Sequence, residues 1–347
     1  MPTSAVDLDA LRRWLDQHAP EGVAGPLSAS LVAGGRSNPT FALTDGTHRW
    51  ILRRPPFGRV LPTAHDMHRE HRVLTALADA PGVVVPRVVG PVGAEDVLGA
   101  PFYVMERLEG RTLRSAADTA DLTPEQRATL SDALVDLLVA LHAVRPADVG
   151  LADFGRPEGY LDRQLSRWRR QWEASATEDR PVVDQVLHRL RETVPSGNRP
   201  GIVHGDFKLD NVMVALDDPT RIVGLLDWEM STLGDTRTDV GILCSFWEGP
   251  GEPVHPITAG STTHRGFPVR AHLADRYVAA VGADDLDIAW FTAFADLKIA
   301  VILEGIHARH LDGHTVGEGF DDIGAMIAPL LDRAWSTLNA SSAAARG

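Results

Sequence analysis

Lysine is almost absent from this chain, although basic residues are not. Of its 34 Lys and Arg residues, only Lys208 and Lys298 are lysines, which leaves 32 arginines (34 minus 2). A compact ammonium on a flexible stem suits a phosphate group as a point charge. Lys208 lies in a polar loop, and this indicates a specific role there. Lys298 lies in the apolar run Leu297-Lys298-Ile299-Ala300, so we expect it to extend from a helix towards solvent.

Cysteine, basic blocks and long apolar runs are also scarce. The single cysteine, Cys244, excludes an internal disulfide and fits a reducing cytoplasm, where we expect the protein. The net charge of −13 argues against nucleic acid or an anionic membrane as partner. The apolar stretch 133–144 is interrupted by Asp136 and His142 and is too short to span a bilayer. The N-terminus has no basic segment followed by an apolar one, so we expect no signal peptide.

The hydrophobic pattern changes along the 347 residues, which are enough for two domains. Alternating apolar residues and turn residues predict a strand-rich first part, with helices at Val6–His18 and Thr63–Ala80. The strands are expected at Leu27–Val32, Thr40–Thr44, His48–Arg53, Val83–Val89 and Phe102–Arg107. The second part is predicted to be helical, at Thr123–Val144, Tyr160–Ser175, Val182–Val194, Thr238–Trp247, His272–Val281, Leu286–Leu311 and Phe320–Ser336.

One polar loop carries the strongest chemical signal. The motif His-Gly-Asp-Phe-Lys-Leu-Asp-Asn, residues 204–211, lies between two short apolar runs, and Leu-Leu-Asp-Trp-Glu follows at 225–229. This set is typical of phosphoryl transfer. Asp206 is the candidate base for a hydroxyl proton, and Lys208 the cation on the transferred phosphate. Asn211 and Asp227 offer the hard oxygen ligands that Mg²⁺ prefers. Turn capping or a surface position is the alternative for each residue, but their joint spacing favours function.

Two neighbouring residues are expected to support this loop rather than to react. His204 is interpreted as a packing residue that braces the loop. Asp239, at the start of a predicted helix, is expected to cap that helix or to brace the loop. Two histidine groups, His65/His68/His71 and His307/His310/His314, lack ligand spacing with cysteines or carboxylates, so we expect no metal site there.

A small sheet-rich lobe followed by a larger helical lobe, with phosphate chemistry between them, resembles the protein kinase-like fold. The motifs are similar to those of the aminoglycoside phosphotransferase and choline kinase-like family. They look closest to the branch whose kinase domain is fused to acyl-CoA dehydrogenases. The supporting segments are 35–38, 52–56, 160–165, 227–235 and 302–306. The resemblance implies a two-lobed α+β fold, with an antiparallel-sheet lobe at 1–106 and a helical lobe at 107–347.

The resemblance also implies a nucleotide site for ATP or GTP with Mg²⁺. Related enzymes place a lysine on the third strand to hold phosphates and to pair with a helix glutamate, and this chain has none. Arg53, or its neighbour Arg54, is the candidate replacement, with Glu70 as partner. The turn formed by Gly34, Gly35, Ser37 and Asn38 would cover the phosphates. Segment 102–110 would be the hinge that meets the base.

The acceptor is expected to be a small-molecule hydroxyl compound. Arg163, Arg167 and Arg170 share one helix face and suit an anionic acceptor such as a hydroxyacyl-CoA, although a solvated basic face is the simpler interpretation. An aminoglycoside, macrolide or nucleoside antibiotic stays open. A catalytically inactive binding module is the alternative that the missing strand lysine supports. A protein kinase is disfavoured because Trp228-Glu229 replaces the expected Phe-Gly and no Ala-Pro-Glu element follows.

Overall fold

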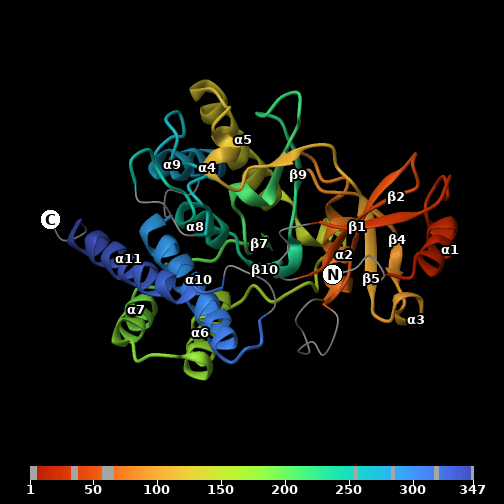
Figure 1. The fold of residues 1–347 in the computed structure, drawn as a ribbon. Coiled ribbons are helices and arrows are strands. Elements are labelled where there is room, and N and C mark those ends of the chain that lie inside the picture. Colours follow the sequence, from red (N-terminus) through yellow and green to blue (C-terminus); the bar gives the residue numbers. More distant parts are fainter. Residues whose placement is uncertain are drawn as a thin grey trace.

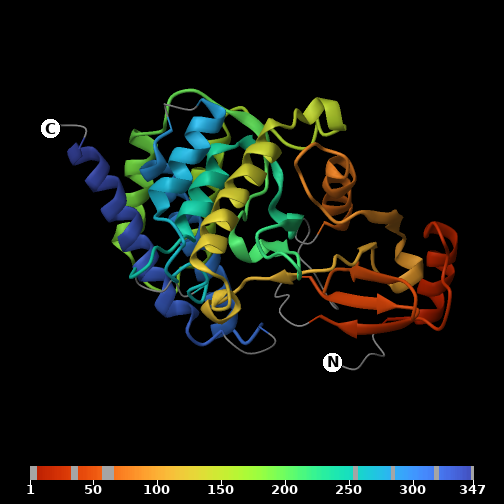
Figure 2. The same ribbon diagram turned by 90° about the horizontal axis from the view of Figure 1, so that it is seen from above.

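The chain folds into a small sheet lobe and a larger helical lobe that lie side by side (Figures 1 and 2). A computed structural model describes residues 6–32, 38–56, 66–252, 257–282, 286–315 and 320–344. The α+β two-lobed kinase-like fold predicted from the sequence is confirmed. One extended segment after residue 106 links the two lobes (Figure 2). No helix among the described residues is long and apolar enough to cross a membrane.

The small lobe is built on a five-stranded antiparallel sheet in the order β1-β2-β3-β5-β4. Alternation along β2 and β3 buries Phe41, Leu43, Trp50 and Leu52 on one face. Helix α1 covers this face in both views, with Trp14 in the same apolar cluster. The elements of this face are α1 (Leu8–His18), β1 (Ser28–Leu31), β2 (Thr40–Thr44), β3 (Arg49–Arg53), β4 (Val88–Gly93) and β5 (Phe102–Glu106).

Helix α2 (Met67–Leu77) packs on the other side of this sheet and brings an acidic residue to it. The Asp66 side chain caps the helix by accepting from the Arg69 amide at 3.1 Å. Val73, Leu74 and Leu77 fill the core, and Glu70 is buried on the same helix. The short helix α3 (Glu95–Leu98) joins β4 to β5.

The helical lobe begins at β6 (Arg111–Thr112), which already pairs with a strand of the polar loop rather than with the five-stranded sheet. Its long central helix α10 packs against α6, α8 and α11. The helices are α4 (Ala116–Thr119), α5 (Pro124–Ala143), α6 (Tyr160–Ser175), α7 (Pro181–Glu192), α8 (Arg237–Ser245), α9 (Arg270–Val281), α10 (Ile288–Leu311) and α11 (Ile323–Ala344), with 3₁₀ turns at Pro146–Val149, Leu209–Asn211 and Trp228–Met230.

Two small sheets frame the polar loop. Strand β7 (Pro200–Val203) pairs with β10 (Thr232–Asp235), and β8 (Val212–Val214) lies between β6 and β9 (Ile222–Leu225). The loop 204–211 therefore leaves one sheet and enters the other, and Asp227 lies two residues after the end of β9. This connection fixes both ends of the segment that carries the predicted chemistry.

Most expected elements form, with two clear corrections. The prediction of a strand at Val83–Val89 is wrong, because the strand in this region is Val88–Gly93. Val83 and Val85 are buried core residues, Val84 accepts from the Leu225 amide at 2.7 Å, and Pro86 has no amide to donate. The last helix begins at Ile323 rather than at residue 320 and continues to Ala344, beyond the expected end at 336.

Candidate active site

The polar loop brings a carboxylate, an ammonium and an amide into direct contact. Asp206 Oδ2 accepts from Lys208 Nζ at 2.7 Å and from Asn211 Nδ2 at 2.9 Å. Among the described residues, Asp206 Oδ1 has no hydrogen-bond partner. One carboxylate oxygen is thus fixed by two donors, and the other is available to a hydroxyl group.

The amide of Asn211 is held in one orientation by the loop. Its Nδ2 also donates to the Asp206 backbone carbonyl at 2.8 Å, so Oδ1 points away from Asp206. The Leu226 amide donates to the Asn211 carbonyl at 2.8 Å, which keeps Asn211 beside the segment that carries Asp227. The Asp227 carboxylate is 36% exposed. An amide oxygen and an accessible carboxylate fit Mg²⁺, which completes its shell with water and phosphate oxygens.

The backbone of Asp227 is unusual for a residue with a side chain. It adopts φ 66° and ψ 67°, in the left-handed region. Such a conformation costs on the order of 1 kcal/mol for a residue other than glycine and is concentrated at functional sites. The 3₁₀ turn Trp228–Met230 follows immediately. The turn from β9 into this segment therefore presents the carboxylate to Arg53 at a cost in backbone strain.

His204 braces the loop. Its Nδ1 accepts from the Asp206 amide at 3.2 Å, and its Nε2 lies 3.0 Å from the Leu226 carbonyl, to which it donates. Burial lowers the pKa of His204, which favours the neutral ring that this bonding requires. The ring packs against Trp228 at 4.6 Å between centroids. Both nitrogens are used, so His204 holds Asp206 in place and does not act as a base.

Asp239 supports the same loop from α8. Its carboxylate accepts from the backbone amides of His204 at 2.7 Å and Gly205 at 2.8 Å. Burial works to raise the pKa of Asp239, but the neighbouring His142 and these amides lower it overall. His142 Nδ1 lies 2.8 Å from the Tyr277 hydroxyl. Bracing of the loop, one of the two roles expected for Asp239, is the one that these contacts show.

Arg53 occupies the position expected for the cation of the third strand. Its Nε lies 3.4 Å from Glu70 Oε2, and its Nη2 donates to Asp227 Oδ1 at 3.3 Å. Burial raises the pKa of Glu70, against the lowering effect of Arg53 and of Tyr103, whose hydroxyl donates to Glu70 at 2.9 Å. Arg54 points elsewhere, since it donates to the carbonyls of Pro55 and Leu98. Arg53 therefore joins the sheet lobe to the loop.

Of the predicted phosphate-covering turn, only Asn38 lies within the described residues. Gly34, Gly35 and Ser37 lie outside them. Asn38 is buried, and its Nδ2 donates to Glu70 at 3.0 Å and to Glu229 at 3.4 Å. Its Oδ1 has no hydrogen-bond partner among the described residues. Asn38 thus lies next to the Arg53 pair and has one acceptor free.

Two residues that sequence reasoning did not place in the site lie beside the loop. Lys298 Nζ donates to the Gly205 carbonyl, so the expectation that Lys298 extends into solvent is wrong. Asp210 Oδ2 lies 4.0 Å from Lys208 Nζ. Burial raises the pKa of Asp210 to about 6, with Lys208 opposing the shift. Both lysines of the chain contact the same loop, so the scarcity of lysine could have indicated from the sequence that Lys298 also belongs to the site.

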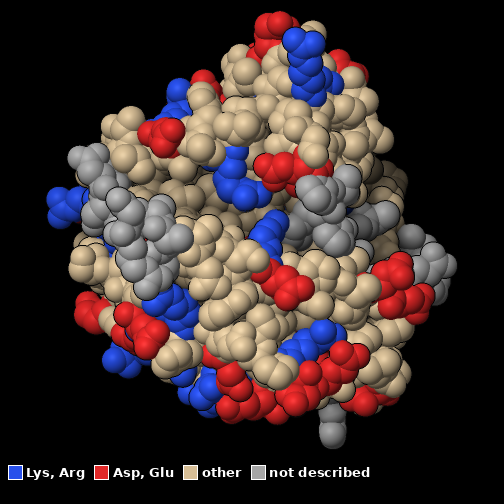
Figure 3. All heavy atoms as spheres, turned by 90° about the vertical axis from the view of Figure 1, so that its left-hand side faces the viewer, with Lys and Arg blue, Asp and Glu red and all other residues tan. Residues whose placement is uncertain are grey.

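The arginines expected on one face of α6 differ in their contacts. Arg163 donates to the carbonyls of Glu158 and Arg156, whereas Arg167 and Arg170 are exposed. Across the described residues, no group of three or more His, Cys, Asp or Glu side chains could hold a metal ion. On the face shown in Figure 3, Lys and Arg are interspersed with Asp and Glu. Cys244 is buried, and burial raises the pKa of its thiol to about 12.

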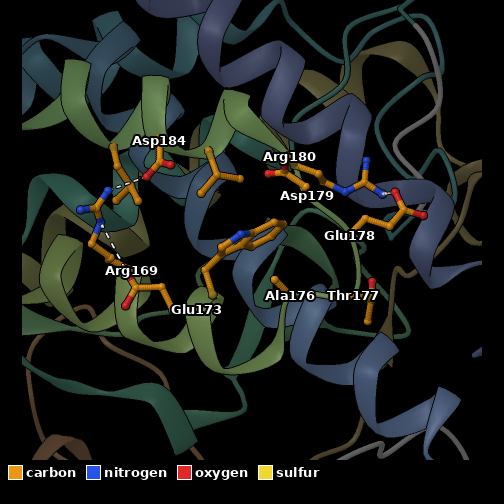
Figure 4. A pocket seen from close by; sticks show the side chains of 11 residues that line it. Arg169, Glu173, Ala176, Thr177, Glu178, Asp179, Arg180 and Asp184 are labelled. Carbon is orange, nitrogen blue, oxygen red and sulfur yellow. Dashed lines mark hydrogen bonds and ion pairs between the residues drawn. The ribbon is translucent and has the colours of Figure 1, made fainter.

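A separate cavity of about 410 Å³ lies between α6 and α7 (Figure 4). Its walls carry four carboxylates but only two guanidinium groups, Arg169 and Arg180. Arg169 pairs with Asp184 at 2.5 Å and Arg180 with Glu178 at 2.7 Å. Such a lining does not suit an anionic nucleotide, and none of the predicted site residues contributes to it.

The sequence profile of the phosphotransferase enzyme family, APH, matches residues 28–294. This chain belongs to that family. The match spans the strand that carries Arg53, the polar loop and Asp227, so the family assignment rests on the segments that build the site. The resemblance stated from the sequence is therefore confirmed.

Curated relatives include acyl-CoA dehydrogenase family members from animals. Family member 11 from Rattus norvegicus is 34% identical over 326 residues, which cover 92% of this chain and 41% of the relative. Family member 11 from Homo sapiens is 32% identical and covers 96% of this chain and 43% of the relative. The chain thus spans less than half the length of these relatives.

Solved structures show the same fold. A protein assigned as an aminoglycoside phosphotransferase from Ralstonia eutropha has a TM-score of 0.81 at 33% identity and covers 96% of this chain and 98% of its own. The complex of aminoglycoside phosphotransferase APH(4)-Ia with ADP and hygromycin B has a TM-score of 0.62 at 15% identity, over 96% of this chain and 98% of its own. At 15% identity, the similarity to APH(4)-Ia shows a common fold and nothing more. Together with the family match, these structures support a small-molecule phosphotransferase.

Proposed function

We propose that this protein transfers the γ-phosphate of ATP or GTP to the hydroxyl group of a small molecule, with Asp206 as the base. The observation that carries this proposal is the bonding of Asp206. Lys208 and Asn211 hold Oδ2, whereas Oδ1 has no partner among the described residues. A carboxylate fixed in this way can orient a hydroxyl group and receive its proton.

The proposed reaction is a direct displacement. The acceptor oxygen forms a bond to the γ-phosphorus, the bond from that phosphorus to the β–γ bridging oxygen breaks, and the nucleoside diphosphate leaves. Asp206 takes the hydroxyl proton. The Lys208 ammonium pairs with Asp206 before the reaction and would interact with charge on the transferred group. His204 and Asp239 keep the loop in position.

Arg53, Asn211 and Asp227 would hold the nucleotide side of the site. Arg53 reaches Asp227 in this structure and offers a planar guanidinium to phosphate oxygens. Asn211 Oδ1 and the Asp227 carboxylate would ligate Mg²⁺, which when bound would neutralise charge on the β- and γ-phosphates. The related APH(4)-Ia structure contains ADP, and another related phosphotransferase contains GDP, which supports a purine nucleotide here.

For the acceptor, we propose a hydroxyl compound with an anionic or acyl portion, such as a hydroxyacyl-CoA. The curated relatives are named as acyl-CoA dehydrogenase family members, and this chain covers 41–43% of their length. The exposed Arg167 and Arg170 add positive charge on α6. Aminoglycosides are polycations and fit such a surface poorly. Macrolides and nucleosides are the other acceptor classes to test.

The proposal is tested by incubating the protein with ATP or GTP, Mg²⁺ and a panel of hydroxyacyl-CoAs, aminoglycosides, macrolides and nucleosides. Mass spectrometry would detect a phosphate adduct on one acceptor class. Asp206→Ala is the matched control and should lose the adduct while it keeps nucleotide affinity. Equal turnover in both proteins would contradict the proposal, and nucleotide binding without any product would favour a binding module.

A further inference from the structure

Both lysines of this chain contact the polar loop, but in different electrostatic settings. Lys208 forms an ion pair with Asp206 at 2.7 Å and has Asp210 at 4.0 Å. Lys298 donates to the backbone carbonyl of Gly205 and forms no ion pair with any carboxylate of the described residues. An ammonium has three donors and no acceptor. At least two donors of Lys298 are therefore left for other partners.

Lys298 reaches the loop from the helical lobe. Helix α10 carries it, and α6 packs against α10 through Trp168 and Phe294, whose ring centroids are 4.4 Å apart. Lys298 is partly buried, in contrast to most of the α10 residues around it, which are fully buried. Its head group contacts the backbone of Gly205, the residue before Asp206.

Lys298 carries a partly buried charge near the loop without a direct carboxylate partner among the described residues. Burial lowers the pKa of its ammonium, against the raising effect of the more distant carboxylates of Asp206 and Asp239. A partly buried charge without a counter-ion is costly, and a bound anion would remove that cost. Lys208 already has Asp206 as its direct counter-ion, so Lys298 is the ammonium at this loop that a bound anion would compensate.

We propose that Lys298 binds an anionic group of the acceptor and so selects anionic alcohols over neutral or cationic ones. The inference rests on the proposed phosphotransferase function, since Asp206 defines where the hydroxyl group lies. The anion would be a carboxylate or a phosphate on the same molecule as the reacting hydroxyl. The γ-phosphate is the other oxyanion near this loop, and the kinetics separate the two.

The test compares a short hydroxycarboxylate with its uncharged methyl amide, in the wild type and in Lys298→Met. The expected result is a KM for the hydroxycarboxylate that rises roughly 10- to 100-fold, as for loss of a charged hydrogen bond. The KM for the amide and for the nucleotide should stay nearly constant. Lys298→Arg should retain most of the preference. Arg191→Met, on an exposed position of α7, is the matched control and should resemble the wild type.

Two outcomes would overturn the inference. An equal fall of kcat for both acceptors would assign Lys298 to the transferred phosphate or to support of Gly205. An unchanged preference in Lys298→Met would remove any role in selection. If the wild type phosphorylates neither compound, the proposed function fails for this panel. Equilibrium binding of the two compounds with a non-hydrolysable ATP analogue then decides the inference: loss of the carboxylate preference in Lys298→Met supports it, and its persistence contradicts it.

Discussion

Arg53 on β3 and Asp227 after β9 lie 3.3 Å apart, although 174 residues separate them in the chain. This contact joins the sheet lobe to the loop of the helical lobe at the predicted phosphate position. It also connects the buried Glu70 to the predicted metal ligand, because Arg53 contacts both carboxylates.

Replacing Arg53 by Met is expected to weaken ATP binding about 10- to 100-fold, because a charge-assisted contact to phosphate would be lost. Arg53→Lys should retain part of the affinity as a point charge. Isothermal titration calorimetry with ATP measures the effect. The neighbouring Arg54→Met is the control, since Arg54 contacts the Pro55 and Leu98 carbonyls. It should lower thermal stability and leave nucleotide affinity nearly unchanged; the reverse pattern would assign the phosphate to Arg54.

Asp227→Asn is expected to raise the Mg²⁺ concentration for half-maximal activity by about tenfold or more, because a carboxylate ligand loses its charge. Titration of activity with Mg²⁺ at saturating ATP measures this change. Asn211→Asp is the informative partner variant, since it adds a carboxylate but removes the amide donors to Asp206. It should lower kcat even at high Mg²⁺. An unchanged Mg²⁺ requirement in Asp227→Asn would exclude Asp227 as a ligand.

The Asp210 carboxyl should make stability depend on pH in an unusual direction. Its pKa is raised from 3.8 to about 6 by burial, so the folded protein binds the proton more tightly than the unfolded chain does. Its contribution to the free energy of unfolding is fully present below pH 3.8. That contribution falls by about 2 to 3 kcal/mol as the pH rises through about 6. Asp210→Asn should therefore gain stability relative to the wild type between about pH 4 and pH 7. Urea unfolding across this range measures the difference.

The exposed Asp217 offers a matched control for that experiment. Asp217 pairs at the surface with Arg221, and surface pairs of this kind contribute roughly 0 to 1 kcal/mol. Asp217→Asn should track the wild type across the pH range. A constant stability difference between Asp210→Asn and the wild type would contradict the raised pKa.

Loss of the Asp239 brace is expected to affect both stability and rate. Asp239→Ala would leave the buried amides of His204 and Gly205 without partners, at a cost of roughly 3 to 5 kcal/mol. Guanidinium unfolding measures this cost. Asp239→Asn keeps one acceptor oxygen and should lose less stability, while kcat falls because the loop is less well fixed. Wild-type kcat in a folded Asp239→Ala protein would contradict the bracing role.

The sequence predicted the loop well because its chemistry is local. Residues 204–211 and 225–229 carry Asp206, Asn211 and Asp227 within a short span, and the structure brings them together. The alternation of side chains along β3 also favours Arg53 over Arg54 as the residue that faces the site. Trp50 and Leu52 face the buried side of β3, and Arg54 follows their period of two, whereas Arg53 faces Glu70.

Other parts of the site depend on contacts that no local pattern reveals. Lys298 meets Gly205 across 93 residues, and its apolar neighbours on α10 suggested a helix surface instead. The raised pKa of Asp210 depends on burial beneath the assembled site. The prediction of a strand at Val83–Val89 was wrong for a similar reason, because the Val84 carbonyl accepts a hydrogen bond from the amide of Leu225, which belongs to another sheet.

The most direct test of the account is phosphate transfer by Asp206→Asn to whichever acceptor the wild type modifies. The prediction is a fall in kcat of about 10²- to 10⁴-fold, the usual contribution of a general base, with ATP affinity within about twofold of the wild type. Single-turnover transfer of labelled γ-phosphate, followed by quenching, measures the chemical step itself. Transfer at the wild-type rate in Asp206→Asn would contradict the assignment of Asp206 as the base.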